Sequence, residues 1–163
     1  MPALVSSEET FRILMLHGYA QSREAFKVKG RLLMQHISQA LLPQITEEYA
    51  GGIEFIFPDA PISLNEVLAD EQDHHSGVNR RAWWLNLDNT SRYIGLEDTI
   101  VTLAQSLGGR PGHAAVGFSQ GSAFAAMIAS LCEATHNPGK RRVLEAQGLP
   151  MNLSLKIFPA SVL

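Results

Sequence analysis

The sequence is poor in the features that mark several common classes of protein. It has a single cysteine, Cys132, so no internal disulfide can form and a reducing compartment is expected. The formal net charge is only −3, which favours neither nucleic acid nor an anionic membrane as a partner. The apolar run Ile13–Leu16 is too short for an export or membrane-spanning segment. We therefore expect a soluble cytoplasmic protein that binds neither a membrane nor nucleic acid.

Phosphate-binding and metal-binding patterns are missing as well. The sequence has no Gly-x-Gly-x-x-Gly and no Gly-Lys-Ser/Thr loop, which argues against a flavodoxin-like or nucleotide-binding module. His74 and His75 lie near Asp70 and Asp73, but such close spacing in an irregular stretch is more typical of a solvated loop than of a metal site. We predict neither a metal nor a cofactor.

What the sequence does contain predicts one α/β domain. Its 163 residues are 45% hydrophobic and 18% charged, typical of a single globular domain, which we take to span residues 1–163. Residues 60–92 lack sustained periodicity and predict a long irregular segment. Pro43 and Gly108 are expected to end the first two helices. Strands are predicted at residues 12–16, 53–57, 113–118 and 153–158, and helices at 26–42, 93–107 and 119–133. This alternation favours three layers, with helices on both faces of a mostly parallel sheet.

The stretch Gly117-Phe-Ser119-Gln-Gly121 stands between a predicted strand and a predicted helix. Gly-x-Ser-x-Gly in this setting is the pattern of a nucleophile elbow, in which a serine occupies a strained backbone turn. The residues two before and two after the serine crowd that turn, so glycine is required at both positions. We therefore predict that Ser119 is a catalytic nucleophile.

A serine nucleophile also needs an oxyanion hole, and the loops at the strand ends can supply one. The backbone N–H of Gln120 follows the elbow serine and is one expected donor. The second donor is expected from the loop after the first strand, where the N–H of Tyr19 is the first candidate and that of Ala20 its neighbour. His17 closes the same strand, and we interpret it as fixing the loop by a hydrogen bond rather than as a base.

Five blocks of the sequence together resemble the fungal serine hydrolase family. That family includes the human ovarian-cancer-associated hydrolase and esterase or thioesterase components of fungal polyketide pathways. The blocks are Leu16-His-Gly-Tyr-Ala-Gln-Ser22, Phe57-Pro-Asp-Ala-Pro61, Arg81-Ala-Trp-Trp84, Tyr93-Ile-Gly-Leu-Glu97 and Gly117-Phe-Ser-Gln-Gly121. The resemblance implies an α/β-hydrolase fold that acts on small-molecule carboxylic esters or thioesters, with Ser119 as nucleophile. Trp83 and Trp84 match an aromatic block of the family, which is placed either near the acyl group of the substrate or in the packed interior.

The sequence departs from the family after the nucleophile. In this fold the triad acid and then the histidine follow the serine. Here only Glu133, Glu145 and His136 follow, and Glu133 lies about 21 Å from Ser119 along the predicted helix, too far for a base. We expect that the final strand–helix units, with the triad acid and histidine, are missing from a chain truncated at its carboxyl end. His74 and His75 are the alternative bases, and a catalytically inactive remnant or binding protein is the alternative function.

Overall fold

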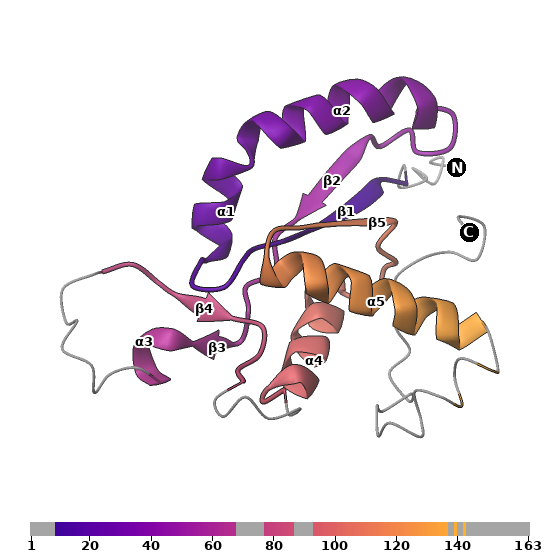
Figure 1. The fold of residues 1–163 in the computed structure, drawn as a ribbon. Coiled ribbons are helices and arrows are strands. Elements are labelled where there is room, and N and C mark those ends of the chain that lie inside the picture. Colours follow the sequence, from indigo (N-terminus) through magenta and orange to yellow (C-terminus); the bar gives the residue numbers. More distant parts are fainter. Residues whose placement is uncertain (1–8, 68–76, 87–92, 137–138, 140–141, 143–163) are drawn as a thin grey trace, which may run out of the picture.

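A computed structural model describes residues 9–67, 77–86, 93–136, 139 and 142 of the chain (Figure 1). The predicted strand at residues 153–158 and the histidines at 74 and 75 lie outside these residues. Strands and helices alternate along the chain, as predicted. The elements are β1 (Phe11–Leu16), α1 (Arg23–Lys29), α2 (Arg31–Ile45), β2 (Ile53–Ile56), β3 (Ile62–Ser63), α3 (Leu64–Val67), β4 (Arg81–Ala82), α4 (Leu96–Leu107), β5 (Ala114–Gly117) and α5 (Gln120–His136).

The strand β1 forms the centre of a parallel sheet with the order β2-β1-β5. Its side chains alternate between the two faces of the sheet, and both faces are buried. Ile13 and Met15 belong to one apolar cluster, and Leu14 and Leu16 belong to the other. A strand buried on both faces reads as a continuous apolar run, which is why the sequence predicted it correctly.

Helices cover both faces of the sheet, which makes the three-layer arrangement predicted from the sequence. The helices α1 and α2 lie on one side of the strands, and α4 and α5 lie on the other (Figure 1). The first face packs Phe26 of α1 and Ile37 of α2 against the sheet. The second face packs Leu103 of α4 and Phe124 of α5, both fully buried, against Leu14 and Leu16.

The helix predicted at residues 26–42 is wrong in both its continuity and its end. Gly30 divides it into α1 and α2, and its N–H donates to the carbonyl of Phe26 at 2.8 Å. Pro43 lies inside α2 rather than after it. The side chains of Gln44 and Thr46 donate to the carbonyl oxygens of Ala40 and Leu42, one turn earlier on the same helix.

The segment predicted to be irregular contains two short strands and a short helix. The strands β3 and β4 pair antiparallel, and an isolated bridge joins Leu85 to Ile94. Because Ile94 takes part in this bridge, α4 begins at Leu96 and not at Tyr93. Its predicted end at Gly108 is confirmed, since that glycine caps the helix with a positive φ of 60°.

At the end of the sheet opposite Ser119, the guanidinium of Arg12 joins three parts of the chain. Its side chain is 5% exposed and pairs with Glu54 of β2 at 3.0 Å. The Nη1 atom donates to the carbonyl oxygens of Leu107, Arg110 and Pro111. The backbone N–H of Arg12 donates to Nδ1 of His113 at 2.9 Å. The charge is buried but fully paired, and it fixes the start of β5 against β1 and β2.

Candidate active site

The carboxyl ends of the three parallel strands bring three loops together, as expected from the sequence. The register pairs Leu16 of β1 with Gly117 of β5, so the residues that follow both strands emerge at one edge. His17 follows β1 and Ser119 follows β5. Asp59 follows β2, and its carboxylate contacts His17. The loops predicted to converge therefore do so.

Ser119 occupies the strained turn that the pentapeptide predicted. Its φ is +52°, in the left-handed region that residues with a side chain rarely adopt. A Cβ atom on Gly117 would lie 2.3 Å from the carbonyl oxygen of Gly121. A Cβ atom on Gly121 would lie 2.2 Å from the carbonyl oxygen of Leu16. Both glycines are therefore required by close backbone contacts, and Ser119 stays exposed at the start of α5.

The loop after β1 leaves the backbone N–H of Tyr19 without a hydrogen-bond partner among the described residues. The neighbouring Ala20, at a φ of +58°, donates its N–H to the carbonyl of Arg81 at 2.9 Å. Among the described groups, none accepts from the N–H of Gln120 either. Of the two candidates in the loop after β1, only Tyr19 thus keeps a free N–H for a ligand.

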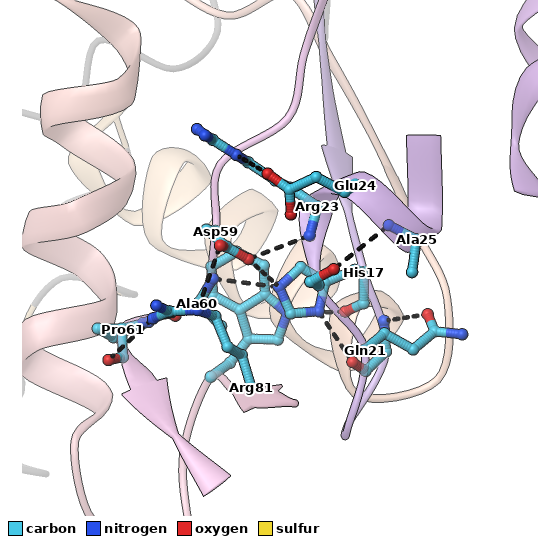
Figure 2. Close-up of polar contacts among 12 residues, drawn as sticks. His17, Gln21, Arg23, Glu24, Ala25, Asp59, Ala60, Pro61 and Arg81 are labelled. Carbon is cyan, nitrogen blue, oxygen red and sulfur yellow. Dashed lines mark hydrogen bonds and ion pairs between the residues drawn. The ribbon is translucent and has the colours of Figure 1, made fainter. Parts of the chain in front are cut away.

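His17 fixes this loop from behind, which confirms the structural role predicted for it (Figure 2). Its ring is fully buried, and Nδ1 lies 2.9 Å from the carbonyl oxygen of Gly18. The Nε2 atom lies 3.1 Å from the N–H nitrogen of Ala60 and 3.3 Å from Oδ1 of Asp59. A neutral ring with its proton on Nδ1 accepts from Ala60, whereas a protonated ring pairs with Asp59. In either form each ring nitrogen already contacts another polar group.

Asp59 and Arg81 tie the loops after β1 and β2 together (Figure 2). The carboxylate of Asp59 accepts from the N–H of Arg23 at 3.0 Å and lies 3.2 Å from Nε of Arg81. Burial opposes the ionisation of Asp59. Hydrogen bonds from His17 and Arg23 and the charge of Arg81 nevertheless hold its pKa below the ordinary value of 3.8. Sequence reasoning missed this pairing, although both residues lie in blocks that resemble the family.

Trp83 and Trp84 have different environments. Trp83 is fully buried, donates its indole N–H to the carbonyl of His17 at 2.8 Å and stacks at a tilt on Phe124. Its surroundings favour the packing role left open above. Trp84 is only partly buried, and the centroids of its ring and that of Tyr93 lie 5.9 Å apart in a T-shaped arrangement. A contact between Trp84 and substrate stays a prediction.

None of the described histidine side chains lies beside the hydroxyl of Ser119 as a base. His17 is buried behind the loop, His36 is exposed on α2, and His113 lies at the opposite end of the sheet. Within the described residues no hydrogen bond to Oγ of Ser119 is formed.

The described residues contain no cluster of His, Cys, Asp or Glu suited to a metal ion. They also contain no helix long and apolar enough to cross a membrane.

A strained serine between two crowded glycines, at the end of a parallel strand and the start of a helix, is the nucleophile elbow of an α/β-hydrolase. The model of a family described as "Serine hydrolase (FSH1)" matches residues 6–153. The chain belongs to this family of serine hydrolases, as the resemblance implied, and its fold class is that of the α/β-hydrolases.

Curated relatives carry related names. Family of serine hydrolases 2 of Saccharomyces cerevisiae is 34% identical over 126 residues, 74% of this chain and 54% of its own length. An uncharacterized hydrolase of Schizosaccharomyces pombe is 30% identical, over 74% of this chain and 28% of its own length. An esterase of Anopheles gambiae is 26% identical, over 77% of this chain and 45% of its own length. The chain thus spans about half or less of the length of these relatives. No solved structure matches it significantly.

Proposed function

We propose that this chain carries the nucleophile and the oxyanion hole of a hydrolase for small-molecule carboxylic esters or thioesters. The observation that carries the proposal is the backbone of Ser119, at a φ of +52° between Gly117 and Gly121. Such strain persists only where the surrounding contacts impose it, and it is typical of functional positions. Here it exposes the hydroxyl at the edge where three loops meet.

In the proposed reaction, Oγ of Ser119 attacks the carbonyl carbon of the substrate. The alcohol or thiol leaves with a proton, and water then releases the acid from the acyl-enzyme. The negative charge on the carbonyl oxygen would be stabilised by the N–H groups of Tyr19 and Gln120. Both are free among the described residues, and the amino end of α5 adds a favourable dipole. Removing one such donor typically costs about 3 kcal/mol of transition-state stabilisation.

The acyl side of the site is proposed to be apolar. Phe118 and Tyr19 are 56% and 49% exposed. Phe118 directly precedes Ser119 in the elbow, and Tyr19 lies in the loop after β1. A Cβ atom placed on Gly18 would lie 2.9 Å from the ring of Phe118, which places that ring over the loop that carries Tyr19. Exposed aromatic rings beside a nucleophile suit an alkyl or aryl substituent of the ester.

We further propose that this chain is a weak hydrolase, because none of its described residues provides a base for Ser119. The helix α5 continues without a break to His136, so Glu133 lies about 21 Å from Ser119 at 1.5 Å per residue. Hydrolases without a working triad retain roughly 10³–10⁴-fold acceleration over water through the oxyanion hole and binding. A complete triad contributes roughly a further 10⁶-fold.

The test is slow labelling of the purified chain with a fluorophosphonate, followed by peptide mapping. We expect slow modification at Ser119 that is abolished in Ser119→Ala and retained in Ser130→Ala, which removes an exposed hydroxyl from the same helix. Parallel assays with a p-nitrophenyl ester and the matching thioester compare the two substrate classes. No modification of Ser119 after long incubation would contradict the proposal and favour an inactive binding protein. Rapid modification would show that a base is present, and His74 and His75 would be replaced first.

A further inference from the structure

Residues 81–84, which we call the brace, contact both loops that carry the proposed oxyanion donors. On one side, the backbone of Arg81 pairs with the loop after β1. The N–H of Ala20 donates to the carbonyl of Arg81 at 2.9 Å, and the N–H of Arg81 donates to the carbonyl of Gln21 at 3.0 Å. These two bonds hold the residues immediately after Tyr19.

On the other side, the side-chain amide of Gln120 binds the backbone of the brace. Its Oε1 atom accepts from the N–H of Trp83 at 2.9 Å, and its Nε2 atom donates to the carbonyl of Trp84 at 2.9 Å. A primary amide is suited to this, because it donates and accepts from the same planar group. Gln120 therefore anchors the elbow to the brace through its side chain, while its own N–H stays free.

The brace is itself fixed to the core. The indole of Trp83 donates to the carbonyl of His17, and the hydroxyl of Thr99 on α4 donates to the carbonyl of Trp83. The guanidinium of Arg81 adds a bond to the carbonyl of Ala60 at 3.0 Å. The two oxyanion loops are thus joined to each other through a segment that is packed against the sheet.

From these contacts we propose that the brace sets the spacing between the N–H groups of Tyr19 and Gln120, and that the side-chain amide of Gln120 is a positioning group in the hydrolase reaction. This inference rests on the proposed oxyanion hole. Both donors must lie 2.7–3.1 Å from one developing oxyanion, although they come from loops on different strands. A misplacement of about 1 Å can cost roughly 100-fold in rate. A rigid connection between the two loops prevents such a misplacement of the two N–H groups.

Three substitutions separate positioning from simple electrostatics. Gln120→Met keeps the length of the side chain but removes both bonds and adds no charge. Gln120→Glu keeps the acceptor, but above the pKa of the new carboxyl group it places an oxygen anion against the carbonyl of Trp84. In acid the protonated carboxyl again donates and accepts, as the amide does. Gln35→Glu makes the same change at an exposed position of α2 and is the matched control.

The readout is the rate of fluorophosphonate labelling at Ser119, taken relative to the unsubstituted chain at each pH between about 4 and 8, a range that includes the ordinary pKa of a glutamate. We expect Gln120→Met to be about 10- to 100-fold slower at every pH. Gln120→Glu should be similarly slow at high pH and should recover as the pH falls, while Gln35→Glu follows the unsubstituted chain. A normal rate in Gln120→Met would overturn the inference. In that case a slow Gln120→Glu would reflect only repulsion of the oxyanion.

Hydrogen exchange supplies a measurement that does not depend on labelling. In Gln120→Met the amides of Trp83 and Ala20 should both exchange faster, whereas the amides of β1 should keep their protection. Unchanged exchange at Ala20 would overturn the connection between the loops, even in a variant that labels slowly. An unsubstituted chain that does not label, combined with faster exchange in Gln120→Met, would reject the proposed function and leave the brace established. Circular dichroism confirms that each variant is folded.

Discussion

Nε2 of His17 lies 3.3 Å from Oδ1 of Asp59, and this contact joins the loop after β1 to the loop after β2. The carboxylate also receives the N–H of Arg23 and the charge of Arg81. Asp59 is thus a polar centre at which the loops after β1 and β2 and the side chain of Arg81 meet. Its pKa lies below the ordinary value of 3.8, so ionised Asp59 stabilises the folded chain at neutral pH.

We predict that Asp59→Asn lowers the free energy of unfolding by about 1–3 kcal/mol at pH 7, because the charged hydrogen bonds are lost. Because the folded pKa is depressed, this stabilisation is complete above the unfolded pKa and disappears as the pH falls through the folded value. The difference between the two chains should therefore shrink below about pH 4. Denaturant unfolding at pH 7 and pH 3.5 measures it. An equal difference at both values would contradict the assigned role.

The crowding around Ser119 predicts a graded response to Gly→Ala changes. Gly121→Ala places a Cβ atom 2.2 Å from the carbonyl oxygen of Leu16, and we expect loss of at least about 3 kcal/mol or failure to fold. Gly108→Ala meets open space, but at a φ of +60° it should cost about 1–2 kcal/mol. Gly77→Ala, whose added Cβ atom would have no neighbour within 4 Å among the described residues, is the control. Thermal melting of the three variants should follow this order, and a stable Gly121→Ala would refute the elbow geometry.

The sequence predicted those parts of the site that are specified by residues close together in the chain. The position of Ser119 was predictable, since the glycines, the preceding strand and the following helix lie within one short stretch. The strand β1 was predictable because apolar residues fill both of its faces. Whether Ser119 reacts remains to be tested.

The brace was not predictable in the same way. The side-chain amide of Gln120 accepts from the N–H of Trp83, which lies 37 positions earlier in the sequence. The carboxylate of Asp59 lies 3.2 Å from Nε of Arg81, on a strand of only two residues. No local periodicity specifies such pairs. The error at Pro43 has a related cause. The ring was expected to end the helix, but α2 continues through Pro43 to Ile45, and local sequence does not specify this continuation.

The buried guanidinium of Arg12 predicts a large effect on stability. Arg12→Met removes the donor of three backbone carbonyls and leaves Glu54 with the hydroxyl of Thr10 and the exposed guanidinium of Arg110 as its partners among the described residues. We expect a loss of at least about 1–3 kcal/mol in the free energy of unfolding, because the carbonyl oxygens lose a charged donor. Arg23→Met removes an exposed pair with Glu24 and should cost less than about 1 kcal/mol. Urea unfolding of both variants measures the contrast, and equal effects would contradict it.

His113 predicts a dependence of stability on pH near neutrality. Burial first, and then the charge of Arg12, hold its pKa below the ordinary value of 6.5. The unfolded chain therefore binds the proton more readily, and stability should fall as the pH drops below about 6.5. His113→Gln should flatten this dependence while keeping an acceptor for the N–H of Arg12. Unfolding curves at pH 5.5 and pH 7.5 test the sign, and a chain that becomes more stable in acid would contradict it.

Substitutions of the two tryptophans should have different effects on stability and on the preference for labelling probes. Trp83→Phe loses the hydrogen bond to the carbonyl of His17, so we expect a destabilisation of about 1–3 kcal/mol. Because Trp83 is fully buried, the preference of Ser119 between short and long alkyl phosphonates should not change. Trp84→Ala leaves the backbone carbonyl that Gln120 binds, but it removes the partly buried ring.

If Trp84 contacts the acyl group, Trp84→Ala should slow labelling by a long-chain alkyl phosphonate more than labelling by a methyl analogue. Burial of each methylene group contributes about 0.8 kcal/mol, so a lost contact with two or three of them changes the ratio by roughly 10-fold or more. Labelling rates with both probes, measured on Trp84→Ala and Trp83→Phe, give this ratio directly. An unchanged ratio in Trp84→Ala would assign Trp84 to packing against Tyr93 and Phe124 alone. A changed ratio in Trp83→Phe would show instead that the buried indole shapes the acyl site from beneath.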